Sequence, residues 1–302
     1  MIPKIVHYCF GMSPDFGGKP WSLVHYICLR SAVERIRPTE ILFHCEHEPT
    51  GPWWEVSRPM VTVQRLRAPR EIFGHPLIHD AHRADIVRLE KLLSAGGIYL
   101  DADVFVHRSF DSLLKQAMVL GEERVDETVI GLCNAVILAE AQAPFLKRWY
   151  SEYRSFRSKG RDSYWDEHSV RIPYQLSRKF ADEITILPHS AFFWPTFNAK
   201  GLAKMFESSE PVDVSTAYAT HLWESFSWEQ YLEHLTPGRV RSVPTNFHHW
   251  ARPMIETLPD DYGALTTTAR VKHGVRRQAR RLRSFTHSCI TELTRYLCSS
   301  AR

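Results

Sequence analysis

The chain has 302 residues and a formal net charge of +4 at pH 7, with 44% hydrophobic and 24% charged residues. This length and composition are typical of a globular protein with one large domain or two small ones. The charge is uneven, because residues 271–302 contain eight Lys or Arg residues and one acidic residue, a net +7 that leaves −3 for the rest. Basicity is therefore local, and we expect no nucleic-acid partner.

Three further features bear on the compartment. No run of about 18 apolar residues occurs, so no transmembrane helix is predicted. The first six residues lack the charged and apolar regions of a secretory signal. The six cysteines show no Cys-x-x-Cys spacing, which indicates reduced, mostly buried thiols. We therefore expect a cytoplasmic protein.

Strands alternate with a helix in the first part of the chain. Short runs of β-branched and aromatic residues predict strands, and apolar residues every three or four positions predict a helix. By these signals the strands are residues 2–9, 40–45 and 61–66, and the helix is residues 21–36, which ends before Pro38. This alternation favours an α/β fold with a parallel, doubly wound sheet.

A second helix is predicted from Asp80 to Ala95. Its apolar residues, Ile86, Leu89, Leu92 and Leu93, form one inward face. Asp85 and Arg88 are three positions apart, so their side chains lie one turn from each other. Gly96 or Gly97 supplies the left-handed residue that ends such a helix.

Asp101 and Asp103 come at the end of the short apolar strand that follows. Along an ideal strand their side chains would face opposite ways. If the strand turns after Asp101, however, both carboxylates can converge on one ion. Such hard oxygen ligands favour Mg²⁺ or Mn²⁺.

These residues together form one spaced motif, Ala84-Asp85-x-x-Arg88 followed by Gly96-Gly97-x-Tyr99-x-Asp101-x-Asp103. The motif resembles the sugar-nucleotide signature of glycosyltransferase family 32, which includes the large glucosylating toxins and the Golgi initiating mannosyltransferases. The resemblance covers about residues 2–235. It implies a GT-A-like doubly wound mixed sheet with helices on both faces, and we expect this domain to span residues 1–268.

The resemblance also implies roles for residues of the first half. Asp101 and Asp103 are expected to bind Mn²⁺ or Mg²⁺, and both are candidate catalytic residues. Residues expected to bind the nucleotide-sugar donor are Asp85, Arg88, Gly97 and Tyr99, together with Tyr8, Cys9 and Phe10 of the first strand. Phe10 would stack on the base, and Arg88 would contact the donor through its forked guanidinium.

In the second half, Asn134 follows an apolar segment and resembles a donor-sugar contact of the family, although a buried structural amide fits its sequence context equally well. Asp166 or Glu167 is the candidate carboxylate near the anomeric carbon, and we assign Glu167. His221 is expected to complete the metal site, with Trp223 and Trp228 closing over the diphosphate. The aromatic residues 192–194 resemble the floor of the acceptor cleft.

The sequence therefore predicts a retaining, metal-dependent hexosyltransferase that uses a UDP-hexose rather than a GDP-sugar and acts on a glycan or glycolipid acceptor in polysaccharide or lipopolysaccharide biosynthesis. The alternatives are a non-catalytic carbohydrate-binding protein on the same fold and a sugar nucleotidyltransferase. Residues 269–302 form a separate basic tail. Its apolar stripe over residues 271–297 predicts an amphipathic helix that binds an anionic membrane at the inner face, or docks on a partner or on the body.

Overall fold

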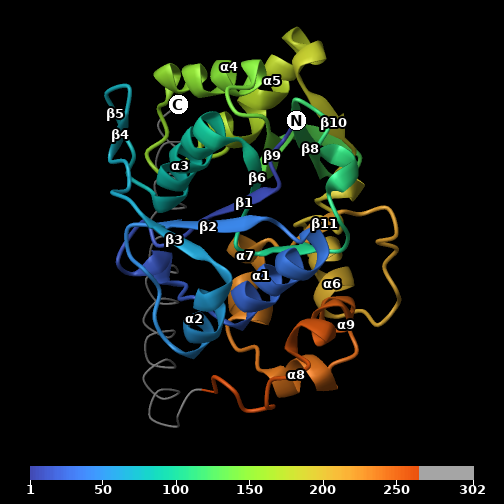
Figure 1. Cartoon of the computed structure of the whole chain (residues 1–302). Coiled ribbons are helices and arrows are strands. Elements are labelled where there is room, and N and C mark those ends of the chain that lie inside the picture. The colour runs from blue at the N-terminus through green and yellow to red at the C-terminus, as the bar shows by residue number, and fades with distance from the viewer. Residues whose placement is uncertain (265–302) are drawn as a thin grey trace, which may run out of the picture. The chain divides into compact units, whose positions relative to one another are not determined.

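One seven-stranded sheet organises residues 1–264, the part of the chain that the computed structural model describes (Figure 1). Residues Met1–Tyr262 form one unit around it. The strand order is β10-β8-β9-β6-β1-β2-β3. In chain order the strands are β1 (Ile5–Cys9), β2 (Glu40–Cys45), β3 (Thr62–Arg65), β6 (Gly97–Leu100), β8 (Met118–Val125), β9 (Thr128–Ala139) and β10 (Thr185–Leu187).

The sheet is mixed. β1 pairs in parallel with β2 and β6, β2 pairs in parallel with β3, and β10 pairs in parallel with β8. β9 is antiparallel to both of its neighbours, β6 and β8. Two residues separate β8 from β9, and a connection that short can join only antiparallel strands. The mixed sheet implied by the resemblance is therefore confirmed, and the wholly parallel sheet expected from alternation alone is wrong at β9.

Helices cover both faces of the sheet (Figure 1). One buried apolar cluster contains residues of α3, α4 and α5, and a second contains residues of α1, α2, α6, α8 and α9. The helices are α1 (Leu23–Ile36), α2 (Pro52–Ser57), α3 (Asp80–Ala95), α4 (Pro144–Glu152), α5 (Ile172–Lys179), α6 (Ala199–Phe206), α7 (Glu224–Ser227), α8 (Pro237–Ser242) and α9 (Asn246–Ala251). The site described below lies where β1 and β6 end.

Two small antiparallel pairs complete the fold. β7 (Val104–Val106) pairs with β11 (Ala219–His221), and β4 (Glu71–Ile72) pairs with β5 (His75–Pro76). The first pair joins the segment after β6 to a segment more than a hundred residues later. It therefore fixes the late part of the chain against the middle of the sheet.

Most element boundaries agree with the sequence predictions, and α3 and β2 agree at both ends. The helical segment over residues 167–179 is irregular. A π-helical turn, Glu167–Arg171, precedes α5, and the Ile172 N–H bonds back to the Glu167 carbonyl. Pro173 lacks an N–H, so the ladder cannot continue through it, and α5 restarts with proline in its first turn.

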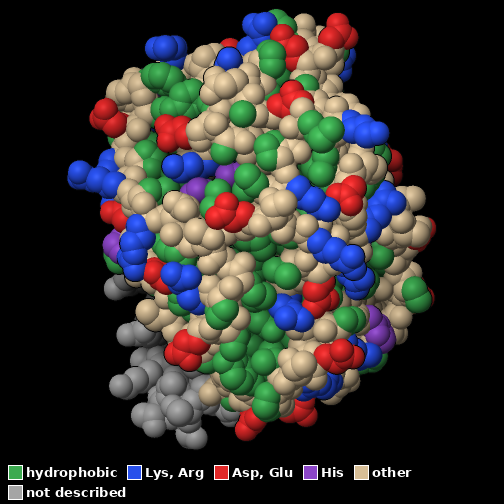
Figure 2. Space-filling model, in the orientation of Figure 1, with side chains coloured by type: hydrophobic (Ala, Val, Ile, Leu, Met, Phe, Trp, Pro, Cys, Tyr) green, Lys and Arg blue, Asp and Glu red, His purple; other side chains and the backbone are tan. Residues whose placement is uncertain are grey.

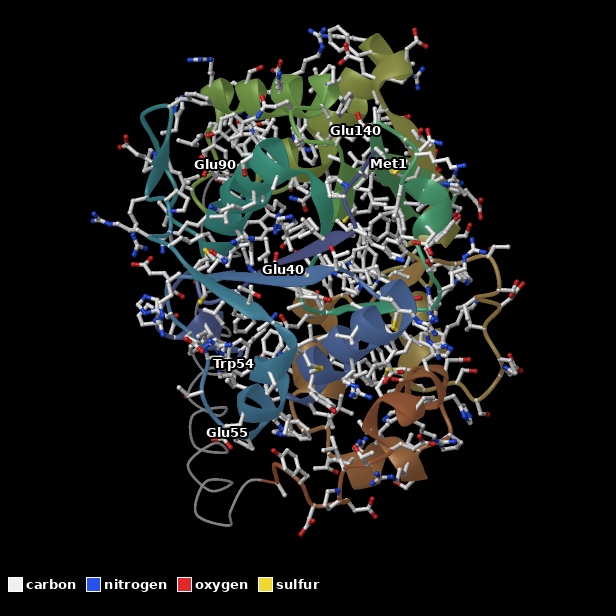
Figure 3. The ribbon with its side chains drawn as sticks, in the orientation of Figure 1. Met1, Glu40, Trp54, Glu55, Glu90 and Glu140 are labelled. Atoms are coloured by element: carbon white, nitrogen blue, oxygen red, sulfur yellow. The ribbon has the colours of Figure 1, made fainter. Side chains whose placement is uncertain are left out.

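Local ion pairs and hydrogen bonds connect the layers. The N-terminal amine contacts Glu140, and Tyr150 of α4 donates a 2.7 Å hydrogen bond to Glu90 of α3 (Figure 3). On the other face, Trp54 packs on Phe43 of β2 with ring centroids 4.6 Å apart. Positive and negative side chains are interspersed over the face shown in Figure 2.

Among residues 1–264, no helix combines the length and the apolar character needed to cross a bilayer. The four cysteines of this part are buried and unpaired. The predicted amphipathic helix over residues 271–297, and with it the predicted membrane contact, lies outside the described residues.

Candidate metal and donor site

A cavity of about 590 Å³ opens where β1 and β6 end. One wall comes from the C-terminal ends of β1 and β6, from α3 and from β9. The rest of the lining comes from residues 161–170, from β8 and from residues 221–226. Ligands of open α/β sheets bind at such strand ends, so this cavity is the candidate site.

The two aspartates of the motif lie in a tight turn inside this cavity. The Val104 N–H donates to the Asp101 carbonyl at 3.0 Å, so the chain reverses between β6 and β7. His221 arrives on β11, where it pairs with Val104. One ligand atom from each of Asp101, Asp103 and His221 lies within 4.8 Å of the others. The turn expected after Asp101 is thus present, and it brings both carboxylates to one point.

The hydrogen bonds of Asp101 leave one of its carboxylate oxygens free. Tyr99 Oη donates to Asp101 Oδ1 at 2.6 Å, and Arg88 Nη1 pairs with the same oxygen at 3.1 Å. No hydrogen bond from the described residues reaches Oδ2. Burial raises the pKa of Asp101, and Arg88 opposes that rise. Asp101 is therefore oriented through one oxygen and offers the other.

Asp103 is held from the opposite side. Its Oδ2 accepts from the Glu224 N–H at 2.7 Å and lies 3.2 Å from His221 Nε2. Burial works to raise the pKa of Asp103, but His221 and the Glu224 N–H outweigh it, so the pKa lies below its usual range. Burial works to lower the pKa of His221, but Asp103 outweighs it and raises that pKa.

The three candidate metal ligands suit a divalent cation. The buried Nδ1 of His221 has no hydrogen-bond partner among the described residues, and Asp101 offers a free oxygen in the same cluster. Two carboxylates suit Mg²⁺ or Mn²⁺, and an imidazole ligand is more typical of transition-metal ions than of Mg²⁺. These three residues are the ones that could hold the ion.

A buried polar network borders this cluster. Asn134 Nδ2 donates to Asp85 Oδ1 at 2.7 Å, and Arg88 Nη1 donates to the Asn134 carbonyl at 2.9 Å. Arg88 Nη2 lies 3.4 Å from the same Asp85 oxygen, and its guanidinium stacks 4.3 Å from the Tyr99 ring centroid. Arg88 therefore uses its forked donors on protein groups rather than presenting them to a phosphate. Its position makes it the support of Asp85 and Asp101.

The residues at the end of β1 differ in whether they reach the cavity. Cys9 and Phe10 line the cavity, and burial raises the pKa of Cys9 to about 12. Tyr8 is fully buried in the core and lies outside the cavity lining. Gly97 also lies outside it: a Cβ there would be 2.7 Å from the Ile5 carbonyl oxygen, so its role is close packing of β6 on β1. Of the predicted donor contacts here, the structure brings Cys9, Phe10 and Tyr99 to the site.

Comparison with known proteins identifies the chain. A family model described as "Glycosyltransferase sugar-binding region containing DXD motif" matches residues 60–120. The chain is also 36% identical over 271 residues to "Glucan organizing enzyme 1" of Cryptococcus neoformans var. grubii. This match covers 86% of this chain and 73% of the relative. The chain belongs to the DXD glycosyltransferases.

Solved structures with a similar course of the chain are also glycosyltransferases. GlyE of Streptococcus pneumoniae TIGR4 has a TM-score of 0.47 and 12% identity, over 92% of this chain and 64% of that one. An active-site mutant of LgtC has a TM-score of 0.42 and 16% identity, over 85% of this chain and 98% of that one. The mixed sheet described above is the GT-A fold that the family resemblance implied, and family membership implies a divalent metal ion and a nucleotide-sugar donor.

Residues 223–226 close one end of the glycosyltransferase cavity. Trp223 has a left-handed backbone, with φ of 55°, and its Nε1 donates to the Pro195 carbonyl at 2.9 Å. It lines the cavity together with Glu224 and Phe226. Trp228 does not line it and instead stacks on His25, with ring centroids 6.1 Å apart. Of the two tryptophans predicted to close over the diphosphate, Trp223 therefore lines the cavity and Trp228 packs outside its lining.

Of the two candidate carboxylates Asp166 and Glu167, Asp166 lines the cavity, and it pairs with Arg171 at 2.9 Å. Glu167, the residue assigned from the sequence, accepts a 2.9 Å hydrogen bond from Arg157 Nε and lies outside the cavity lining. A π-helical turn starts at Glu167, and no sequence signal indicated which of the two neighbours would face the cavity.

Sequence reasoning missed other cavity residues of the glycosyltransferase. Glu123 reaches the cavity from β8, and burial raises its pKa against a hydrogen bond from Cys133. The one signal for it was an acidic residue in the apolar stretch after Met118. The predicted aromatic floor is also different: Phe192 and Phe193 are fully buried in the core, and Phe197 and Phe226 line the cavity.

Proposed function

We propose that this glycosyltransferase is metal-dependent, retains anomeric configuration, and transfers a hexose from a UDP-hexose rather than a GDP-sugar to a glycan or glycolipid acceptor in polysaccharide biosynthesis. The observation that carries the proposal is the cluster of Asp101, Asp103 and His221. It faces the cavity directly beside the buried Asp85, Arg88 and Asn134 network. An ion site and a sugar-hydroxyl site therefore lie next to each other.

Asp101, Asp103 and His221 would hold the ion, with Mn²⁺ preferred for the reason given above. A bound divalent ion neutralises the charge that develops on the leaving nucleoside diphosphate. The chain contributes orientation: Tyr99 and Arg88 fix Asp101 through one oxygen, and the Glu224 N–H fixes Asp103. Ligands fixed in this way do not have to be ordered when the substrate arrives.

The remaining cavity residues position the donor. Asp85 and the Asn134 amide would bind sugar hydroxyls. Arg88 neutralises the charge of the buried Asp85 carboxylate. Phe10 offers a ring for the base at the end of β1. For retention, the leaving phosphate takes the proton of the acceptor hydroxyl on the face where the new bond to the anomeric carbon forms, as the family resemblance implies.

The acceptor proposal rests on two observations. The relative that is 36% identical is named for organizing glucan, which supports a polysaccharide acceptor. The cavity wall around Phe197 and Phe226 is aromatic and open, with Phe226 59% exposed, and aromatic faces with nearby carboxylates suit sugar rings.

The test is release of nucleotide from a panel of UDP- and GDP-sugars, with Mn²⁺, with EDTA, and with Asp103→Ala in Mn²⁺. We expect slow hydrolysis of one UDP-hexose, lost in both the chelated and the substituted protein. Asp111→Ala is the matched control, because Asp111 is an exposed carboxylate paired with Lys4 away from the cavity.

Two results would contradict the proposal. Release that persists in EDTA would remove the metal dependence. Absence of release, together with absence of nucleotide-induced thermal stabilisation, would favour a carbohydrate-binding protein without a donor site.

A further inference from the structure

The loop between β1 and α1 brings one lysine next to the metal cluster. Lys19 follows a 3-10 turn, Phe16–Gly18, in which Gly17 and Gly18 have positive φ of 60° and 78°. Its Nζ lies 3.3 Å from Glu224 Oε2. Glu224 is also the residue whose N–H donates to Asp103, at 2.7 Å. The Lys19 side-chain ammonium is thus connected through Glu224 to Asp103, one of the residues that could hold the ion.

Glu224 does not need Lys19 to stay in place. Its other oxygen, Oε1, lies 2.9 Å from His25 Nε2. His25 Nδ1 accepts from the Ser22 N–H at 2.9 Å, so Nε2 carries the proton and donates to Glu224. The His25 side chain is fully buried, whereas Lys19 is 22% exposed. Lys19 can therefore leave Glu224 while His25 continues to hold it.

The charge balance of the cavity creates a demand for such a cation. The described residues that line it include seven carboxylates, and the only Arg or Lys side chains among them are Arg88 and Arg161. Arg88 is committed to Asp85 and Asp101, and Arg161 lies over the Trp165 ring, 5.6 Å from its centroid. A nucleoside diphosphate adds further negative charge. A lysine ammonium on a flexible stem is suited to contact a phosphate as a point charge.

We propose that Lys19 is a ligand of the donor's terminal phosphate and exchanges Glu224 for that phosphate when the nucleoside diphosphate binds. This rests on the proposed function, because it requires a donor diphosphate at the ion cluster. The exchange adds one charge-assisted contact and leaves the Glu224 main-chain bond to Asp103 unchanged.

The test is the dissociation constant of UDP and of UMP, with GDP and GMP in parallel, measured calorimetrically with Mn²⁺ on the full chain. UMP has the base and the first phosphate but lacks the terminal one. Lys19→Met should raise the dissociation constant of UDP about tenfold or more, which is the value of a charge-assisted hydrogen bond. It should change that of UMP less than twofold. Lys19→Arg should recover most of the difference.

The matched control is Lys4→Met. Lys4 is also a partly exposed lysine in a single ion pair, but its partner Asp111 lies outside the cavity lining, whereas the partner of Lys19, Glu224, belongs to it. Lys4→Met should change neither constant. Glu224→Gln distinguishes two roles of Lys19, as a phosphate ligand or only as an anchor of Glu224. The substitution removes the ion pair and frees Lys19, so UDP binding should not weaken if Lys19 binds the phosphate. If Lys19 only anchors Glu224, this variant should weaken UDP binding as much as Lys19→Met does.

The outcomes separate the two proposals. If the wild type binds UDP and Lys19→Met binds it with the same dissociation constant, the role of Lys19 is overturned and the proposed function stands. Equal loss of UDP and UMP in Lys19→Met also overturns it, because the effect would then not involve the terminal phosphate. Absence of binding of any nucleoside diphosphate to the wild type overturns both proposals.

Discussion

The two walls of the cavity are built differently. On the donor wall, formed by α3, β6 and β9, the polar side chains are nearly buried and bond to one another across elements: Asp85 and Arg88 are each 5% exposed and Asn134 is 8% exposed. On the proposed acceptor wall, formed by residues 161–170 with Phe197 and Phe226, the acidic side chains have partners that are close in the chain. Asp162 bonds to the N–H groups of Lys159 and Tyr164, and Asp166 pairs with Arg171.

This difference separates two tasks. Groups locked by several buried hydrogen bonds are preorganised, as a reaction centre requires. Groups held only by near neighbours can be replaced without disturbing the fold. The donor wall is therefore expected to tolerate little change, and the acceptor wall to carry the specificity that differs among related enzymes. The predictions below compare matched substitutions on the two walls.

The largest expected effect is on activity. Asp101→Asn on the donor wall should lower donor hydrolysis about a thousandfold, because it weakens both the ion site and the charge stabilisation that the ion provides. Asp166→Asn on the acceptor wall should lower it about tenfold at most. Initial rates with a saturating donor measure both. Equal losses would mean that the two walls do not divide the work in this way.

The next effect is on stability. Arg88→Met leaves the buried Asp85 and the partly buried Asp101 without their cation, and should lower the free energy of unfolding by about 3 to 5 kcal/mol. The control is Arg157→Met, since Arg157 is 55% exposed and pairs with Glu167. It should cost about 1 kcal/mol or less. Urea unfolding of both variants measures the difference. A loss below 1 kcal/mol for Arg88→Met would show that the network does not support the donor wall.

A third effect depends on pH and concerns the strands behind the donor wall. His7 Nδ1 and His44 Nε2 are 3.0 Å apart and buried, and His7 Nε2 contacts the Gly96 carbonyl at 2.9 Å. Burial lowers the pKa of His44 to about 3. The unfolded chain, with a histidine pKa of about 6.5, therefore binds this proton first as the pH falls.

Stability should consequently decrease as the pH falls below about 6.5. Between pH 6.5 and 4.5 the wild type should lose about 2 kcal/mol more of its free energy of unfolding than His44→Phe does, because the variant lacks the group that titrates. Denaturant titrations at the two pH values measure this. Parallel pH curves for the two proteins would contradict the prediction.

The smallest effect is expected at the rim of the acceptor wall. Phe226 is 59% exposed and stacks on Phe197, with ring centroids 5.2 Å apart. Phe226→Ala should raise the KM for the acceptor severalfold, because one aromatic face is lost. It should change the free energy of unfolding by about 0.5 kcal/mol or less. A change in the KM for the donor with none in the KM for the acceptor would contradict the prediction, because Phe226 would then contact the donor.

The donor wall was largely predictable from sequence because its residues are close in the chain. α3, the glycine corner and the Asp101–Asp103 turn form one continuous segment, and helical spacing already placed Asp85 beside Arg88. The sequence pattern could not predict which groups the Arg88 guanidinium contacts. Arg88 faces protein groups because Asn134 arrives on β9, a contact that depends on the antiparallel strand order.

The acceptor wall could not be predicted in the same way, because long-range packing decides which neighbour faces the cavity. Asp166 rather than Glu167 lines it owing to the π-helical turn, and Phe197 and Phe226 replace the buried Phe192 and Phe193. Phe10 and Tyr8 differ in a similar way: Tyr8 lies within β1 and is buried in the core, whereas Phe10 follows the end of β1 and lines the cavity. In each case the residue type was foreseen, and the direction of the side chain depended on packing against distant segments.

The pairing of β7 with β11 has a consequence for biosynthesis. Asp101 and Asp103 are synthesised with β6, but His221 is added more than a hundred residues later. Until β11 has emerged from the ribosome, the nascent chain has an incomplete ion site and an unpaired β7 edge, the kind of exposed edge that promotes association between chains. Ion binding by all three ligands therefore reports that translation and folding have proceeded at least as far as β11.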